Sequence, residues 1–290
     1  GCQVYRNLKA NHPFPPAYLG DSYYAGTKLS NDFAACGANY WTDCTVWQIT
    51  NSHEIALVSR GKAKLITADY IIIATGAIER AMPVRGWTLP GVMSVGGAQT
   101  LLKQAALGAD EAVFVGSGPL LYLTVWQYIK AGLSVSAVID TTGRSQWLSA
   151  LAFAPLALLQ PDMLAMGQKW LREIRQKVDV IKNVEGVEIV GRSQVEALSY
   201  TTSSGEKIDL PAKHVFLHQG VIPNINLSMA TGLEHRWDQK AYYWRPVTDA
   251  TGKSSDEQIY IAGDGSGVGG AKAAAITGQL SASAIVARYG

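Results

Sequence analysis

Two segments decide the fold: Tyr70–Gly91, YIIIATGAIERAMPVRGWTLPG, and Ile259–Gly270, IYIAGDGSGVGG. Each begins with a short branched apolar run, Ile71–Ile73 or Ile259–Ile261, which is typical of a strand buried on both faces of a parallel sheet. Small residues follow each run, and a nucleotide that approaches the backbone at the carboxyl end of a sheet requires this lack of bulk. We therefore predict that the two segments flank one bound flavin nucleotide.

The second segment carries an acid inside a run of glycines. Asp264 precedes a helix expected over about 270–289, so its carboxylate can bind a polyol hydroxyl while the helix N-terminus attracts negative charge. The alternative is that Asp264 only caps this helix. Five glycines within residues 263–270 are costly in entropy for a cap alone, which favours ligand binding. We assign to the FAD site Val46, Thr75, Gly76, Ala77, Gly263, Asp264, Gly270 and Ala271.

A βαβ unit lies in the middle of the chain, with strands expected at 111–115 and 133–140 around a helix at 120–131. The turn has glycines at Gly116 and Gly118, but Leu121 stands where a dinucleotide fingerprint has its third glycine. Asp140 stands where an acid would hold a ribose hydroxyl. Two interpretations remain open: a weak NAD(P) site at Gly116, Gly118 and Asp140, or the nucleotide fold without its ligand.

The order of the expected elements gives the domain organisation. Three short strands at 45–50, 54–60 and 64–68 form an antiparallel meander, and further strands are expected at 187–190, 195–201, 207–210 and 214–218. The predicted class is α/β, with two Rossmann-like, three-layer dinucleotide-binding domains, the second inserted in the first. The FAD domain would comprise residues 1–108 and 216–290, and the NAD(P)-binding-like domain residues 109–215.

Composition excludes several classes of protein. Apolar residues make up 48% and charged residues 17%, the net charge is +2, and no basic stripe suggests a nucleic-acid partner. No apolar run reaches the roughly 20 residues of a membrane span. The three cysteines form no C-x-x-C pair, which excludes a redox dithiol and suggests a reducing, cytoplasmic location, either free or peripheral to the inner face of the membrane.

Other chemistry-bearing residues receive modest roles. The five histidines form no metal-binding pair, and for His218, at an expected domain crossover, we predict a structural hydrogen bond. Arg80 could contact a phosphate or form an ion pair with Glu79. Trp47, next to Val46, could reach an adenine through its backbone.

Several motifs resemble one flavoprotein family. They are ATGAIER at 74–80, GWTLPGVMSVGGAQTLLK at 86–103, VGSGPLLYL at 115–123, HQGVIPN at 218–224 and AGDGSGVGGAKAAAITGQLSA at 262–282. The family is that of the pyridine nucleotide-disulfide oxidoreductases. Within it, the motifs are similar to the branch without the disulfide: the alpha-type subunits of opine oxidases, hydrogen cyanide synthase, and multimeric proline and sarcosine dehydrogenases.

The first residues, GCQVYR, resemble a segment that follows the family's first GxGxxG unit. We therefore expect about 30–40 further residues upstream, which would form the first βαβ unit of the FAD domain.

The resemblance implies a division of labour. FAD would be bound here, with NAD(P) a possible second ligand, and the amine or amino acid would be oxidised on a beta-type flavoprotein partner. This chain would pass electrons between flavin and an acceptor, so no catalytic residue is assigned. The alternatives are a stand-alone NAD(P)H-dependent flavin reductase of a ferredoxin or small acceptor, and a degenerate nucleotide-binding subunit with a structural role.

Overall fold

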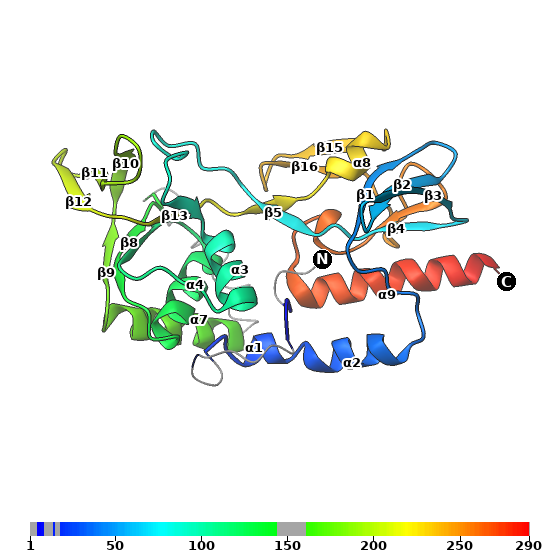
Figure 1. The fold of residues 1–290 in the computed structure, drawn as a ribbon, viewed down its shortest axis with the longest axis horizontal. Coiled ribbons are helices and arrows are strands. Elements are labelled where there is room, and N and C mark those ends of the chain that lie inside the picture. The colour runs from blue at the N-terminus through cyan, green and yellow to red at the C-terminus, as the bar shows by residue number, and fades with distance from the viewer. Residues whose placement is uncertain (1–4, 9–13, 15–17, 144–160, 290) are drawn as a thin grey trace. The chain divides into compact units, whose positions relative to one another are not determined.

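The computed structural model describes residues 5–8, 14, 18–143 and 161–289 (Figure 1). The chain divides into two compact units. The first contains Lys28–Ile78 and Val221–Gly290, and the second contains Tyr5–Thr27 and Glu79–Gly220. The boundaries between these ranges therefore follow residues 27, 78 and 220, whereas the predicted domain boundaries follow residues 108 and 215. Those domain boundaries stay a prediction.

The second unit is built on a parallel sheet with the strand order β6-β13-β7-β8-β9. The strands of this sheet are β6 (Val92–Ser94), β7 (Ala112–Gly116), β8 (Val135–Asp140), β9 (Asp179–Lys182) and β13 (Val215–His218). The helices among the described residues of the unit are α1 (Asp21–Tyr24), α3 (Val95–Ala105), α4 (Pro119–Lys130) and α7 (Pro161–Arg175). The sequence over 148–178 is typical of one or two helices broken around Pro155 and Pro161. Residues 148–160 lie outside the described part of the chain, and α7 begins at Pro161.

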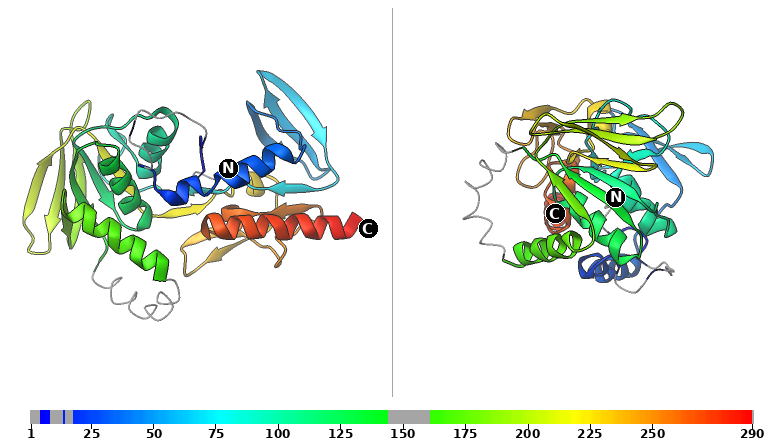
Figure 2. Two further views of the ribbon diagram at one scale, coloured as in Figure 1. Left: turned by 90° about the horizontal axis from the view of Figure 1, so that it is seen from below. Right: turned by 90° about the vertical axis from the view of Figure 1, so that its left-hand side faces the viewer.

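Alternation along the strands builds three layers in this unit (Figures 1 and 2). Phe114, Val138 and Phe216 pack against α3, α4 and α7 on one face of the sheet. Their neighbours Val113 and Val115 pack on the other face, against an antiparallel meander. The strands of that meander are β10 (Val184–Val190), β11 (Ala197–Thr202) and β12 (Lys207–Pro211). The predicted three-layer α/β class is confirmed.

The first unit holds the predicted N-terminal meander and several small sheets. Strands β1 (Cys44–Ile49), β2 (Glu54–Ser59) and β3 (Lys62–Thr67) pair antiparallel in that order, as predicted. The other strands of the unit are β4 (Ile71–Ile73), β5 (Ala77–Glu79), β14 (Val221–Pro223), β15 (His235–Asp238), β16 (Tyr243–Pro246) and β17 (Ile259–Ile261). Its helices are α2 (Thr27–Ala35), α8 (Asn226–Ala230), the 3-10 turn η1 (Gly263–Gly265) and α9 (Gly270–Tyr289).

Strands β4 and β17 form a parallel pair, with Ile71 opposite Ile259 and Ile73 opposite Ile261. The side chains of β17 are all buried, but Ile72 of β4 is 41% exposed. The prediction that both strands are buried on both faces is therefore wrong for β4. Among the described residues β4 pairs only with β17, so it lies at a sheet edge with one face incompletely covered.

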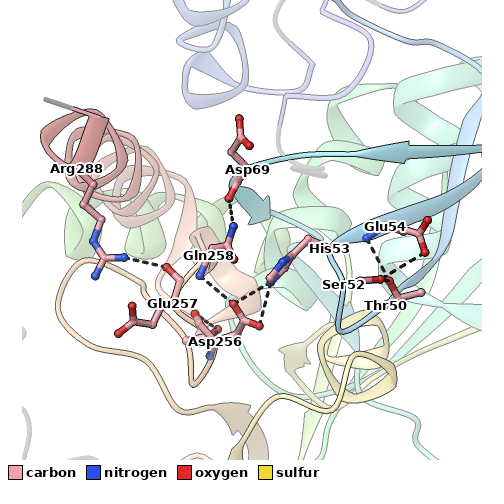
Figure 3. A network of polar contacts seen from close by, with 10 residues as sticks. Thr50, Ser52, His53, Glu54, Asp69, Asp256, Glu257, Gln258 and Arg288 are labelled. Atoms are coloured by element: carbon pink, nitrogen blue, oxygen red, sulfur yellow. Dashed lines mark hydrogen bonds and ion pairs between the residues drawn. The ribbon is translucent and has the colours of Figure 1, made fainter.

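A set of polar contacts fixes the loop before β17 (Figure 3). His53, in the turn between β1 and β2, places Nε2 at 3.1 Å from both carboxylate oxygens of Asp256. Gln258 donates to the carbonyl of Asp69 at 2.7 Å, and Arg288 of α9 donates to the carbonyl of Glu257 at 3.1 Å. The meander, the approach to β4 and α9 are thus all bonded to the same short loop.

The close approach of β7 and β13 yields a stability prediction. A Cβ added to Gly116 would lie 1.7 Å from the carbonyl oxygen of His218, whereas one added to Gly118 would meet nothing within 4 Å. Both glycines have positive φ, so both substitutions strain the backbone. We expect Gly116→Ala to lower the free energy of unfolding by about 1–3 kcal/mol more than Gly118→Ala, because only the first overpacks the sheet. Urea denaturation of the two variants measures this difference, and equal losses would contradict it.

Candidate functional site

The loops that follow β4 and β17 lie against each other. Their parallel pairing brings the two carboxyl ends to the same edge. A Cβ built on Gly265 would lie 3.5 Å from Oγ1 of Thr75 and 3.7 Å from the backbone nitrogen of Gly76. Two predicted site residues from one loop, Thr75 and Gly76, thus meet the glycine-rich turn of the other. That this junction holds FAD stays a prediction.

Asn224 joins the same junction from a third segment. The hydroxyl of Thr75 donates to the carbonyl of Asn224 at 2.8 Å, and the backbone N–H of Asn224 donates to the carbonyl of Gly76 at 2.9 Å. The side-chain oxygen Oδ1 of Asn224 is buried and accepts no hydrogen bond from any described residue. A buried acceptor without a partner is costly, so a donor from a ligand would satisfy it.

The glycine-rich turn places Asp264 at the start of α9. Its Oδ1 accepts hydrogen bonds from the backbone N–H groups of Gly269 and Gly270, both at 2.9 Å. The capping role given as the alternative is therefore present. Binding of a polyol hydroxyl stays a prediction that is compatible with it, because these two bonds use one of two carboxylate oxygens.

The turn also has room for a ligand. Gly270 has φ of 80°, and a Cβ built on it meets nothing within 4 Å. Ala271 follows within the first turn of α9, where the backbone N–H groups favour negative charge. A small-residue cradle, a helix N-terminus and the orphaned oxygen of Asn224 together fit a nucleotide cofactor such as FAD.

Two residues of β16 support this turn from the side. The hydroxyl of Tyr243 accepts the backbone N–H of Val268 at 3.2 Å. Nη1 of Arg245 lies 3.6 Å from the Cβ position of Gly267, and the same side chain forms an ion pair with Asp238 at 3.4 Å. Tyr243, Arg245 and Asn224 were not predicted from the sequence. For Asn224 a signal existed, since it ends the HQGVIPN motif.

The remaining predicted FAD residues lie in the same unit. Gly263 opens η1 with φ of 71°, and Ala77 begins β5, which pairs with β14. Val46 lies on β1 opposite Leu57, beside a bulge, and is 40% exposed. A role for Val46 toward the nucleotide stays a prediction.

The predicted second nucleotide site lies at the carboxyl ends of β7 and β8, in the other unit. Gly118 is the N-cap of α4, with open space at its Cβ position. Gly116 is needed for packing, because β13 approaches it closely. Leu121 is fully buried in the helix–sheet core, and Asp140 is only 3% exposed. The structure thus provides the turn of a dinucleotide site but buries its acid.

A partly buried pair of titratable side chains, His218 and Glu79, lies near the ends of the second unit's sequence ranges. Nδ1 of His218 is 2.6 Å from Oε1 of Glu79, whose Oε2 accepts the backbone N–H of Gly96 at 2.7 Å. The predicted structural hydrogen bond of His218 is confirmed. Glu79 binds His218 and Gly96, so the ion pair considered between Glu79 and Arg80 is not its main interaction. The backbone N–H of Arg80 donates to Gly220 at 2.9 Å.

Comparison with known proteins now gives the family. The pyridine nucleotide-disulphide oxidoreductase family matches residues 11–278. The chain belongs to this family. It is 40% identical to an opine oxidase subunit of Rhizobium meliloti, over 100% of this chain and 56% of that protein. It is 31% identical to the hydrogen cyanide synthase subunit HcnB of Pseudomonas aeruginosa, over 99% of this chain and 63% of that protein.

A solved structure supports the same fold. Lactococcus lactis thioredoxin reductase in its FR conformation superposes with a TM-score of 0.61 at 17% identity, covering 98% of this chain and 86% of that one.

Family membership implies FAD with a pyridine nucleotide, so the predicted FAD cofactor is confirmed. The chain spans 56% and 63% of the two relatives' lengths. Within the described residues, no helix is both long and apolar enough to cross a bilayer.

The cap of α9 can be tested without any ligand. Asp264→Ala removes the acceptor for two N–H groups, so we expect the free energy of unfolding to fall by about 1 kcal/mol. Asp264→Asn keeps a side-chain oxygen at the same place and should lose only a few tenths of that energy, since Asn is an equally good cap. Denaturant titration compares the variants. An unchanged Asp264→Ala protein would show that the cap contributes nothing.

The orphaned oxygen of Asn224 leads to a prediction about cofactor retention. If it accepts a hydrogen bond from the flavin nucleotide, Asn224→Ala should weaken FAD binding by about tenfold. The measurement is the ratio of flavin absorbance to protein absorbance after gel filtration. Asn226→Ala, two residues later at an exposed position of α8, is the matched control. Equal flavin content in both variants would remove Asn224 from the site.

Proposed function

We propose that this chain is the FAD-binding subunit of a hetero-oligomeric amine or amino-acid dehydrogenase or oxidase, of the opine, glycine, proline or sarcosine type. The similarity along the whole chain to the opine oxidase subunit carries the proposal, together with the similarity to HcnB. Both relatives are subunits by name.

The chemistry of the described site agrees with a role in electron transfer. FAD, when bound, would supply reversible transfer of two electrons. The groups that converge on the junction of the two loops are backbone amides, the hydroxyl of Thr75, the amide of Asn224 and the carboxylate of Asp264. Such groups bind and orient a nucleotide, while proton abstraction from an amine requires a base with a suitably placed partner. Oxidation of a CH–NH or CH–NH₂ donor is therefore assigned to a beta-type flavoprotein partner.

The proposal predicts a dependence on that partner. The full-length protein should purify yellow both alone and together with a beta-type subunit. Under anaerobic conditions, octopine, glycine, sarcosine or proline should bleach the flavin of this chain only in the complex, beyond any bleaching of the partner's own flavin. The matched control is the partner alone with the same amines, which shows how much of the bleaching belongs to its own flavin.

Three outcomes would overturn the proposal. Bleaching of the isolated chain by an amine would place the oxidation in this subunit. Rapid reduction of its flavin by NADH or NADPH alone would instead indicate a stand-alone flavin reductase. A full-length protein that retains no flavin would support a structural role.

A further inference from the structure

Asp140 is the residue that a dinucleotide-binding fold uses to recognise a ribose, and here it is already bonded. It is the last residue of β8, where an acid receives the ribose hydroxyls in NAD-binding folds. Its Oδ2 accepts the hydroxyl of Tyr122 at 2.6 Å, and its Oδ1 accepts the backbone N–H of Thr142 at 2.9 Å. Only 3% of the residue is exposed. The residues around Asp140 therefore do not fit a site in which its carboxylate binds a ribose.

Tyr122 is well placed to hold this bond. It lies in the first turns of α4, next to Leu121, which is fully buried against the sheet and fixes that part of the helix. Burial and the bond to Asp140 raise the pKa of Tyr122 far above its ordinary value, so the hydroxyl stays protonated and donates. A short O–H···O⁻ bond of this kind is among the stronger hydrogen bonds in proteins.

The Tyr122 hydroxyl offers Asp140 the same donor that a ribose hydroxyl would offer. We propose that Tyr122 is a specificity-determining residue: it binds Oδ2 of Asp140, while the backbone N–H of Thr142 binds Oδ1, and so keeps NADH from making its ribose contact with this buried carboxylate at the second nucleotide site. The glycine turn at Gly118 has open space in which a phosphate could bind. The carboxylate that would bind the ribose hydroxyl, however, already accepts a hydrogen bond from Tyr122. The inference stands on the geometry of the second unit alone and does not rest on the proposed function.

The test is a double-mutant cycle on the full chain, read by NADH fluorescence. Tyr122→Phe removes the hydroxyl and should tighten NADH binding by at least about tenfold, as expected when a hydrogen bond to a charged group becomes available. In an Asp140→Ala background the same substitution should change nothing. The affinity for NADPH should not increase, because the carboxylate of Asp140 repels a negatively charged 2′-phosphate.

Controls separate this effect from general loosening of the helix. Tyr128→Phe removes another buried hydroxyl from α4, and it should leave NADH affinity unchanged. Tyr122→Leu is a second variant without the hydroxyl, on a good helix former, in case the first folds poorly. Asp140→Asn in the otherwise native chain keeps one oxygen that can accept from Tyr122 but loses the acceptor for the N–H of Thr142, and it should not alter NADH binding, since the native carboxylate makes no ribose contact.

Three results would overturn the proposal. They are an unchanged NADH affinity in a folded Tyr122→Phe or Tyr122→Leu protein, a tightening that persists without Asp140, and a tenfold loss of NADH affinity in Asp140→Asn. The last would show that the native carboxylate already contacts the ribose.

Discussion

The parallel pairing of β4 with β17 is the constraint on which the candidate site depends. Each strand contributes only three residues, yet the pairing sets Thr75 and Gly76 against Gly265. Branched side chains bury the pair in a small core of Ile49, Ile71, Ile73, Ile259 and Ile261 with Leu233. The polar contacts of Asp256 and Gln258 then hold the loop before β17 in register. Small residues can follow the strands because the strands themselves supply the packing.

The two nucleotide-type sites differ in how their polar groups are satisfied. At the junction of β4 and β17, Oδ1 of Asn224 is buried without a described partner, which leaves a bond for a ligand to make. At the ends of β7 and β8, Asp140 receives its bonds from Tyr122 and Thr142. A few side chains therefore decide whether a nucleotide-binding fold offers an unpaired polar group to its ligand or pairs that group within the protein.

Much of this was predictable from sequence, for physical reasons. Period-two patterning and turn residues located the strands of both meanders, and the βαβ unit around Gly116 was found within one or two residues of its true bounds. The meeting of the two loops followed from the topology of parallel sheets. The contact of Tyr122 with Asp140 could not be predicted, because no sequence pattern shows which residue of a neighbouring strand a tyrosine on a helix will contact. The exposure of Ile72 was not predicted, because a run of isoleucines is equally typical of an edge strand and of a central strand of a sheet.

The connection between β4 and β17 has a consequence for folding. Most of the second unit, Glu79–Gly220, lies between Ile73 and Ile259, so this pair closes one of the longest loops in the chain. Closure of a long flexible loop costs entropy, and that cost falls when the intervening segment is already compact. The second unit should therefore acquire its structure first, and the flavin-type junction should assemble only after β17 has left the ribosome.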